Sequence, residues 1–596
     1  MRTTAVITCS QALDVDVVQR RLHVVRGLLE THRLAAIERG LVRVERVLAR
    51  LVVVHVELLF ALVDRELDAV TRGRADQGGP PNESVSGREN SAVQPATAVK
   101  NSPEVAPANF WTWLDRHEQR IALAMVLGYV VVFGSLSLIR HWAFHSTALD
   151  LGVFDQVLWN TVHGRFMEST LSLERCDPHS FFLDHFSPAL LLIVPFYAAF
   201  QRPETLIVFQ TAALALGAWP VYLLARHYLP RGGERLVWVA VYVLSAPLAW
   251  ITFYDFHEIT LAVLPLGLAM YFLATRRTIP LLLSLGASFL VKEELPLIAV
   301  GFGLALVAQR RWRLGAFVTI VSAAWFIVTL KLIIPAFAGG APYQYLDRYA
   351  SLGGNELEIA RTLLLDPLRV LRVLLSGEVG SKIAFVLTLF APGLGLALRA
   401  RSALIPSIVP LGYLLLSDYG GQHTHHNQYG APVIPLAIGA SIVGFATLRV
   451  SPRLRRRLTG AVLVSAVAFS LVHGAIPFTP DFYDAYLRGN PDRAPSEGQI
   501  FAREPRYEPF LPAVAAIPLD ASISSRDFFT TQVPERRLNY HLNGLDPCAA
   551  QYVILDYADP SVNRDEQKHL AEVATLEAQG YDEVASGKGL SLLRHR

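Results

Sequence analysis

Charged residues are distributed unevenly along this chain of 596 residues, and this pattern limits the possible folds more than any other feature. The 357 residues from Ile121 to Pro477 contain only 44 Asp, Glu, Lys and Arg residues, about 12%. The remaining 239 residues contain 61, about 26%, which is the proportion found in soluble globular domains. A charge-poor middle of this length between two ordinary ends predicts a polytopic membrane protein and excludes a cytosolic enzyme.

The net charge and the cysteines exclude further classes of protein. A net charge of +3 gives no support to nucleic-acid binding, so no nucleic-acid partner is expected. The three cysteines, Cys9, Cys176 and Cys548, form neither a CxxC pair nor a Cys/His zinc spacing. A disulfide-rich scaffold and a metal site built from cysteines are therefore both excluded.

Apolar segments separated by short polar breaks fill the middle of the chain. Several are shorter than the roughly 20 residues that cross a bilayer, so some are expected to be tilted or re-entrant. The segments are 121–139, 188–200, 205–224, 236–252, 259–274, 279–291, 295–308, 314–336, 383–398, 402–417, 431–447 and 459–477. They predict a polytopic α-helical membrane protein with about 11 to 13 transmembrane helices.

The polar breaks between these segments predict the orientation. Breaks rich in Arg, such as Arg226–Arg235 and Arg449–Arg457, are expected on the cytoplasmic side. Breaks rich in His and carboxylates, such as Asp255–Glu258, are expected on the outer side of the cytoplasmic membrane. Two full crossings at 188–200 and 205–224 would break this alternation, so either one of them is not a full crossing or a span has been missed.

The chain divides into four expected parts. Residues 1–77 read as a polar helical extension, or as the product of a start codon assigned too early, and 78–110 as a disordered linker. Residues 111–477 form the transmembrane domain, with a first outer loop at 141–187. The remainder, 478–596, alternates turn signals, strands and one helix, which predicts a small extracytoplasmic α/β domain.

Ionisable residues beside membrane spans are costly unless they are used, so the outer clusters are the candidate sites. Asp150 and Asp155 follow the first span and lie five residues apart, about 140° around a helix, so they do not share a face. Asp150 is either a catalytic carboxylate or a helix N-cap. Candidate substrate-binding residues in the other outer clusters are His185, Asp255, His257, Glu258, Lys292 and Glu293. For Lys292, internal pairing with a carboxylate is the structural alternative.

Two further outer features have a possible role. His423, His425 and His426 fall within four positions and could bind a divalent metal together with a carboxylate, although such a loop cluster can also bind none. Cys176 and Cys548 are both expected on the outer side, where disulfides persist. We expect them to pair and to tie the C-terminal domain to the first outer loop.

Several ordered motifs resemble the bacterial membrane family called domain of unknown function 2079. The resemblance covers roughly residues 120–596. Its motifs are DLGVFDQVLWNTVHGRF (Asp150–Phe166), HFSP (His185–Pro188), DFHE (Asp255–Glu258), VKEE (Val291–Glu294), LKLIIPAF (Leu330–Phe337), SISSRD (Ser522–Asp527) and YVILD (Tyr552–Asp556). That family is in turn similar to the GT-C glycosyltransferases, such as the aminoarabinose lipid A transferases and the protein O-mannosyltransferases.

The resemblance implies a GT-C-like fold and a transferase that takes a sugar from a polyprenyl-phosphate lipid. It implies that Asp150, with Asp155 second, acts as general base or orients the acceptor, although Asp150 is followed by Leu where many members have an Asp-Glu pair. Lys292 and Arg348 are the expected contacts of the departing phosphate, with a cell-envelope molecule as acceptor. A transporter or flippase of a lipid-linked precursor, and a non-catalytic scaffold, remain the alternatives.

Overall fold

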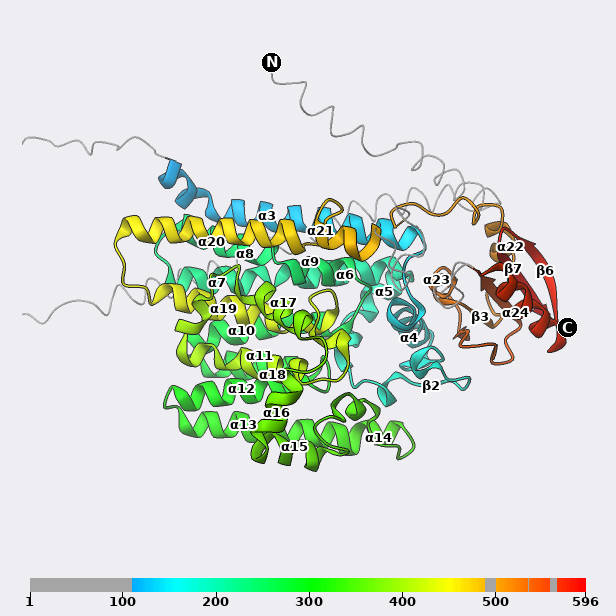
Figure 1. Ribbon diagram of the computed structural model, residues 1–596, viewed down its shortest axis with the longest axis horizontal. Coiled ribbons are helices and arrows are strands. Elements are labelled where there is room, and N and C mark those ends of the chain that lie inside the picture. Colours follow the sequence, from blue (N-terminus) through cyan, green and yellow to red (C-terminus); the bar gives the residue numbers. More distant parts are fainter. Residues whose placement is uncertain (1–109, 488–499, 534, 558–564) are drawn as a thin grey trace, which may run out of the picture. The chain divides into compact units, whose positions relative to one another are not determined.

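The computed structural model describes residues 110–487, 500–533, 535–557 and 565–596, all within one compact unit that spans 105–596 (Figure 1). The expected extension at 1–77 lies outside the described residues, as does the expected linker at 78–110 except for its last residue.

Four helical segments are long and apolar enough to cross a membrane. They are α3 (Phe110–Trp142), the continuous pair α6 (Pro203–Leu216) and α7 (Ala218–Tyr228), the run from α13 (Trp312–Val328) to α14 (Ile334–Phe337), and α19 (Val433–Ala446) together with the turn that precedes it from Gln428. Two bent pairs pass the same test together: α8 (Gly232–Val243) with α9 (Ala246–Phe253), at 43°, and α16 (Pro367–Leu374) with α17 (Val379–Phe390), at 86°. Pro occupies the first turn of α9 and of α16, where its missing N–H costs nothing.

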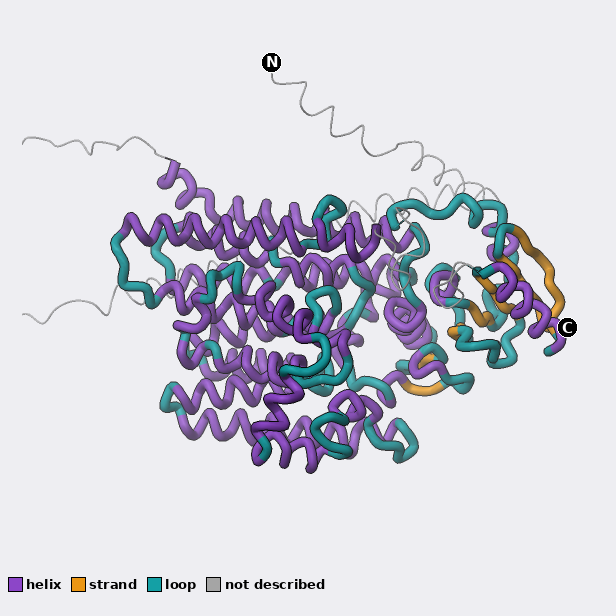
Figure 2. Tube along the Cα trace, viewed as in Figure 1, coloured by secondary structure: helices purple, strands orange, loops and turns teal. Residues whose placement is uncertain are grey.

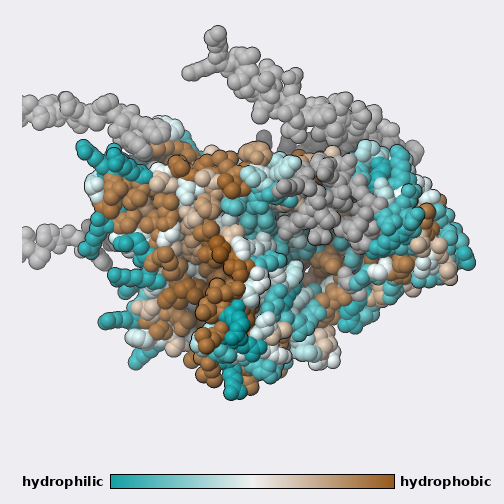
Figure 3. Space-filling view, viewed as in Figure 1, coloured by the Kyte–Doolittle hydropathy of each residue, from teal (hydrophilic) through white to brown (hydrophobic). Residues whose placement is uncertain are grey.

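The helices present apolar side chains outward. Figure 3 shows hydrophobic residues gathered over the helices and hydrophilic residues over the C-terminal domain. Large side chains such as Val131, Ile279 and Leu283 are more than 60% exposed. Apolar surface of this extent has no favourable contact with water, so these faces are suited to lipid. The prediction of a polytopic helical membrane protein is confirmed.

The sequence predicted 11 to 13 spans. Among the described residues, fewer helices than this are long enough to cross a membrane. Four helices qualify, or six if each bent pair is one span. Four expected spans are shorter apolar helices: α10 (Val263–Ala274), α11 (Thr278–Phe289), α12 (Leu295–Ala308) and α18 (Ile405–Leu415). A helix of 12 residues is about 18 Å long, short of the roughly 30 Å hydrocarbon core.

The structure also resolves the ambiguity at 188–224. Residues 188–200 contain a short 3₁₀ turn and then α5 (Val194–Ala199), a helix of six residues. The backbone N–H of Ala189 donates to the carbonyl of Leu290 at the end of α11, 2.8 Å away. This segment is therefore too short to be a full crossing, whereas α6 and α7 together form one.

The C-terminal domain contains a five-stranded sheet in the order β4-β3-β5-β7-β6. Figure 2 shows strands of this domain in orange near the C-terminus. The strands are β3 (Ile523–Ser525), β4 (Asn539–His541), β5 (Tyr552–Asp556), β6 (Tyr581–Gly587) and β7 (Leu590–His595). β3 pairs in parallel with β4 and β5, and β7 pairs antiparallel with β5 and β6. α24 (Glu566–Ala578) joins β5 to β6, which confirms the expected small α/β domain.

Local sequence explains these elements. β5 buries four of its five residues, as its continuous apolar run requires. The Asp565 side chain caps α24 by accepting from the Lys568 N–H at 3.0 Å. β6 and β7 are joined by a two-residue turn in which Lys588 and Gly589 both have positive φ, and glycine adopts that conformation without steric cost.

The first loop packs against this C-terminal domain. Gln156, in α4 (Val153–Val162), donates to the backbone carbonyls of Arg537 and Asn539. The backbone N–H of Ala148 donates to Asp527 Oδ1 at 3.1 Å. The loop that carries Asp150 is therefore held by contacts from nearly 400 residues further along the chain.

Candidate active site beside two cavities

Asp150 lies in a single helical turn, Ala148–Gly152, immediately before α4. Its Oδ1 is 3.0 Å from His257 Nε2, and its Oδ2 accepts from Tyr254 Oη at 3.0 Å and from Thr147 Oγ1 at 2.9 Å. The N-caps of this turn and of α4 are Thr147 and Gly152. Asp150 is therefore not an N-cap here, because its carboxylate binds side chains brought from two separate segments.

The electrostatics keep Asp150 ionised. Burial alone would raise the pKa of Asp150, but the charge and hydrogen bond of His257 hold it below its ordinary value. Burial would likewise lower the pKa of His257, and Asp150 raises it instead. Both shifts in pKa favour the charge-paired form, in which the carboxylate of Asp150 faces a protonated His257.

Asp255 has a positioning role in the same segment. It pairs with Arg140 through Oδ1, and its Oδ2 accepts from the Thr147 N–H at 2.8 Å and from Thr147 Oγ1 at 3.1 Å. Its carboxylate is buried and both oxygens are engaged. Asp255 thus fixes the residue that in turn donates to Asp150, and its side chain is only 1% exposed, whereas that of Asp150 is 23% exposed.

The structure does not bring Asp155 to Asp150. Asp155 is fully buried, and its Oδ1 accepts from Tyr197 Oη at 2.6 Å. Its other oxygen has no hydrogen-bond partner among the described residues. Burial raises the pKa of Asp155 to about 8, so this carboxyl is mostly protonated at neutral pH.

A second charged group lies next to the first along the chain. Glu258 follows His257 and pairs with Lys292, with 2.6 Å between Oε1 and Nζ. The internal pairing considered for Lys292 is therefore present. Glu293 binds His185, with 2.8 Å between Oε1 and Nδ1, and accepts from Tyr343 Oη at 2.8 Å. Burial and Lys292 would lower the pKa of His185, but Glu293 raises it.

Arg348 projects among three tyrosine rings. Its guanidinium carbon lies 4.3 Å from the centroid of Tyr345, 4.9 Å from that of Tyr419 and 5.7 Å from that of Tyr429. Cation–π contacts of this kind hold a guanidinium in place without neutralising its charge. The sequence analysis did not select these tyrosines. The signal that pointed to them was the aromatic run from Tyr343 to Tyr349 around Arg348.

Lys292 and Arg348 line one cavity of about 490 Å³. Its ionisable end also contains His185, Glu293 and Glu294, and burial raises the pKa of Glu294. The remaining wall is largely apolar, including Leu297, Phe326, Leu330, Ile359, Leu363 and Val409. A ligand with a charged head and a long apolar tail matches such a lining.

A second cavity has a volume of about 570 Å³. Tyr345 lines both this cavity and the first one. Leu149, inside the turn that carries Asp150, and Val153, directly after that turn, line this second cavity. Its polar lining residues are Ser172, Asp184, Gln344, Tyr345 and Asp347. Asp150 thus belongs to a segment that borders a polar cavity, next to the amphipathic one.

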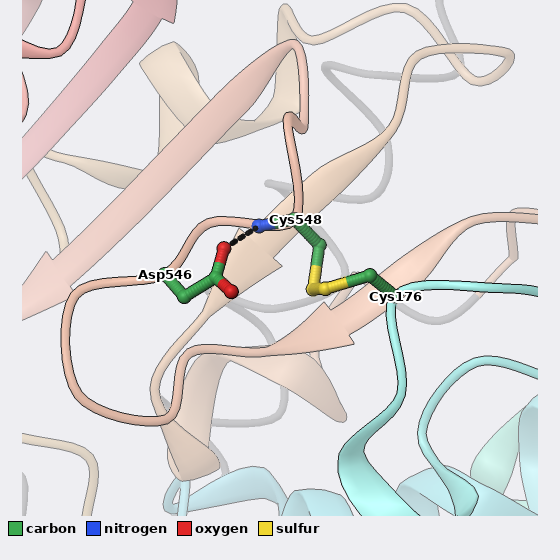
Figure 4. A group of neighbouring side chains, drawn as sticks. All are labelled: Cys176, Asp546 and Cys548. Carbon is green, nitrogen blue, oxygen red and sulfur yellow. Dashed lines mark hydrogen bonds between the residues drawn. A yellow bond between two sulfur atoms is a disulfide. The ribbon is translucent and has the colours of Figure 1, made fainter.

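The remaining candidates lie elsewhere. His425 and His426 both contact Asp481, whereas His423 is buried apart from them and its ring nitrogens have no hydrogen-bond partner among the described residues. Cys176 and Cys548 are joined by a disulfide with Cα atoms 5.0 Å apart. Figure 4 shows this bond and the Asp546 carboxylate, which accepts from the Cys548 N–H.

Comparison with known proteins gives one family match and several structural matches. A family model described as "Predicted membrane protein (DUF2079)" matches residues 140–592, which confirms the resemblance found in the motifs. No curated protein matches the chain.

Ten chains of solved structures match. The apo crystal structure of ArnT from Cupriavidus metallidurans has 13% identity, a TM-score of 0.46, and coverage of 78% of this chain and 98% of that one. The crystal structure of the same protein bound to undecaprenyl phosphate has 14% identity and a TM-score of 0.44, and the match covers 78% of this chain and 98% of that one. The apo crystal structure of the Archaeoglobus fulgidus oligosaccharyltransferase has 12% identity and a TM-score of 0.35, and the match covers 70% of this chain and 64% of that one.

Proposed function

We propose that this chain, which belongs to the DUF2079 family of predicted membrane proteins, is an integral-membrane glycosyltransferase. It takes a sugar from a polyprenyl-phosphate donor on the outer face of the cytoplasmic membrane and transfers it to a hydroxyl group of a cell-envelope acceptor. The observation that carries the proposal is the Asp150–His257 pair beside an amphipathic cavity with Lys292 and Arg348 at its charged end.

The reaction assigns a task to each of these groups. The acceptor oxygen attacks the anomeric carbon, the bond from that carbon to the phosphate oxygen breaks, and polyprenyl phosphate leaves with the bonding electrons. Asp150 takes the proton of the acceptor hydroxyl, which a carboxylate does well only when it is ionised and oriented. Lys292 and Arg348 offset the charge that develops on the departing phosphate.

The neighbouring contacts support this assignment. His257 and Glu258 are consecutive, and they face Asp150 and Lys292 respectively, so one short segment links the base to the phosphate contact. The apolar wall of the first cavity accommodates a polyprenyl chain, and the second cavity, bordered by Leu149 and Val153, accommodates the polar acceptor. The orientation predicted from the Arg-rich breaks places both on the outer side.

Glycan analysis of the cell envelope tests the proposal. A deletion strain is rescued with wild type, Asp150→Asn or Asp177→Asn, at matched levels in the membrane. Asp177 is an exposed carboxylate of the same loop, paired only with its neighbours, and serves as the control. We expect one sugar to be lost on deletion and restored by wild type and D177N but not by D150N.

Two outcomes would overturn the proposal. Full rescue by D150N would reject Asp150 as the general base. An unchanged envelope in the deletion strain would reject the transferase activity itself. In the second case a lipid-precursor transporter becomes the working hypothesis, since the 86° bend between α16 and α17 resembles the broken helices of transporters.

A further inference from the structure

Two histidines and one carboxylate converge at a place that the proposed reaction does not use. His425 Nε2 lies 2.6 Å from Asp481 Oδ2, and His426 Nε2 lies 3.0 Å from Asp481 Oδ1. The three ligand atoms lie within 4.8 Å of one another. His425 is buried, and His426 and Asp481 are about 17% and 18% exposed, so an ion could reach the cluster from solvent.

These three residues come from two separate segments of the chain, which meet only in the folded structure. The histidines precede α19, and Asp481 lies in the short α21 (Pro480–Phe482), after α20 (Pro452–His473). Thr479 holds this turn, because its Oγ1 accepts from the Phe482 N–H at 3.3 Å and donates to the Gly474 carbonyl at 2.6 Å. His473, at the end of α20, has its Nδ1 3.5 Å from Asp481 Oδ2.

The orientation of His426 does not depend on the carboxylate. Its Nδ1 is hydrogen-bonded to Thr424 Oγ1 at 2.9 Å, which leaves Nε2 directed at Asp481. The Trp250 ring contacts His426 edge to face, with 4.5 Å between centroids. A second hydrogen bond that fixes the ring is the usual arrangement of a metal-binding histidine.

We propose that His425, His426 and Asp481 bind a divalent transition-metal ion, best matched by Zn²⁺, with His473 as the fourth ligand. A tetrahedral zinc ion with bonds of roughly 2.0–2.1 Å needs ligand atoms about 3.3 Å apart. The separations between the histidine nitrogens and the Asp481 oxygens, 2.6, 3.0 and 3.5 Å, bracket that value. Since the ligand atoms of His425, His426 and Asp481 lie within 4.8 Å of one another, no two of them need to approach by more than about 1.5 Å. Imidazole nitrogens with one carboxylate favour zinc over calcium or magnesium, which prefer all-oxygen sites.

The site would join three segments at the end of the membrane domain. It clamps the loop before α19, the end of α20 and the turn that leads into the C-terminal domain. Tyr429, three residues after His426, lines the first cavity and contacts Arg348. On the proposed function, the ion therefore also positions one wall of the lipid-phosphate cavity, while metal binding itself is independent of that function.

Metal analysis of the purified full-length chain tests this inference. The protein is prepared without a polyhistidine tag, stripped with a chelator, and titrated with Zn²⁺ alone while bound metal is counted by mass spectrometry. We expect about one zinc per chain for wild type and at least about a tenfold loss of affinity in H425Q, H426Q and D481N. The control is His423→Gln, in the same loop but outside the cluster, and it should bind zinc as wild type does.

The outcomes are distinct from those of the glycan experiment. If wild type binds no more zinc than D481N, or if H423Q loses zinc to the same extent as H425Q, the site is not a metal site. Because D481N keeps the shape of the side chain, its thermal unfolding without metal reveals whether loss of binding reflects misfolding. A folded D481N chain that binds zinc as wild type does would also overturn the proposal.

Discussion

His257 Nε2 lies 3.0 Å from Asp150 Oδ1, and these two residues are 107 positions apart in the chain. The pairing joins the first loop to the turn after α9, and it determines the charge state of both groups. Tyr254 and Thr147 complete the set of donors around Asp150.

Substitution of His257 by Gln should shift the pH dependence of transfer. His257 lowers the pKa of Asp150, so its loss raises that pKa and leaves less ionised carboxylate at a given pH. We expect the acidic limb of the pH–rate profile to move to higher pH, while the rate at high pH is less affected. The profile is measured as sugar transfer by membrane vesicles, and an unmoved acidic limb would show that His257 does not act through Asp150.

Asp155→Asn should leave transfer nearly intact, whereas Asp150→Asn should lower it by about 10²- to 10⁴-fold. Asn mimics the protonated carboxyl that burial favours at position 155.

The raised pKa of Asp155 also makes the stability of the chain depend on pH. Above about pH 4 the Asp155 carboxyl ionises in the unfolded chain, whereas in the folded chain it stays protonated up to about pH 8, so the folded state loses stability as the pH rises through this range.

Thermal unfolding across this range checks the second part. The wild-type chain should lose stability relative to D155N as the pH rises. Parallel curves for the two proteins would contradict the assignment of a protonated Asp155, and a large loss of transfer in D155N would give it a catalytic role after all.

On the proposed function, Arg348→Lys should weaken the binding of a polyprenyl phosphate by at least about tenfold. Lys keeps the charge but lacks the planar group that lies between the rings of Tyr345 and Tyr419. The measurement is equilibrium binding to the protein in nanodiscs. The matched control is Arg361→Lys, in α15 (Glu356–Leu365), a helix that contributes Ile359 and Leu363 but not Arg361 to the lining of the same cavity. Equal losses in both variants would show that the effect is not specific to the guanidinium group of Arg348.

Asp255→Asn should destabilise the chain by about 3–5 kcal/mol, because it leaves Arg140 buried without its carboxylate. The exposed pair of Asp582 and Arg596 provides the comparison, and Asp582→Asn should cost less than about 1 kcal/mol. Both values come from unfolding at fixed detergent and lipid. A similar small effect for the two variants would mean that Asp255 is not a structural anchor of the Asp150 turn.

The disulfide predicts the thiol count. With Cys176 and Cys548 paired, only Cys9 of the three cysteines can react with a thiol reagent in the denatured, unreduced chain. We expect one reactive thiol before reduction and three after it, in protein isolated from the membrane under oxidising conditions. Three reactive thiols before reduction would reject the pairing.

The sequence by itself determined the features that depend on composition and local periodicity. The charge-poor stretch required a helical membrane domain, because buried backbone in lipid must satisfy its own hydrogen bonds. The alternating tail, with YVILD at Tyr552–Asp556, required a small sheet domain. The ordered motifs identified the family, and the outer polar clusters already contained Asp150, His257, Lys292 and Glu293.

Only the tertiary structure decided which of these polar residues face each other. Spacing along the chain separated Asp150 from Asp155, but it could not show that one meets His257 and the other Tyr197. Nor could it select Asp481 as the partner of His425 and His426, since Asp481 lies 55 positions after His426. The number of full crossings was overestimated for the same reason: apolar runs show where a chain avoids water, whereas packing decides which helices cross the bilayer and where each one bends.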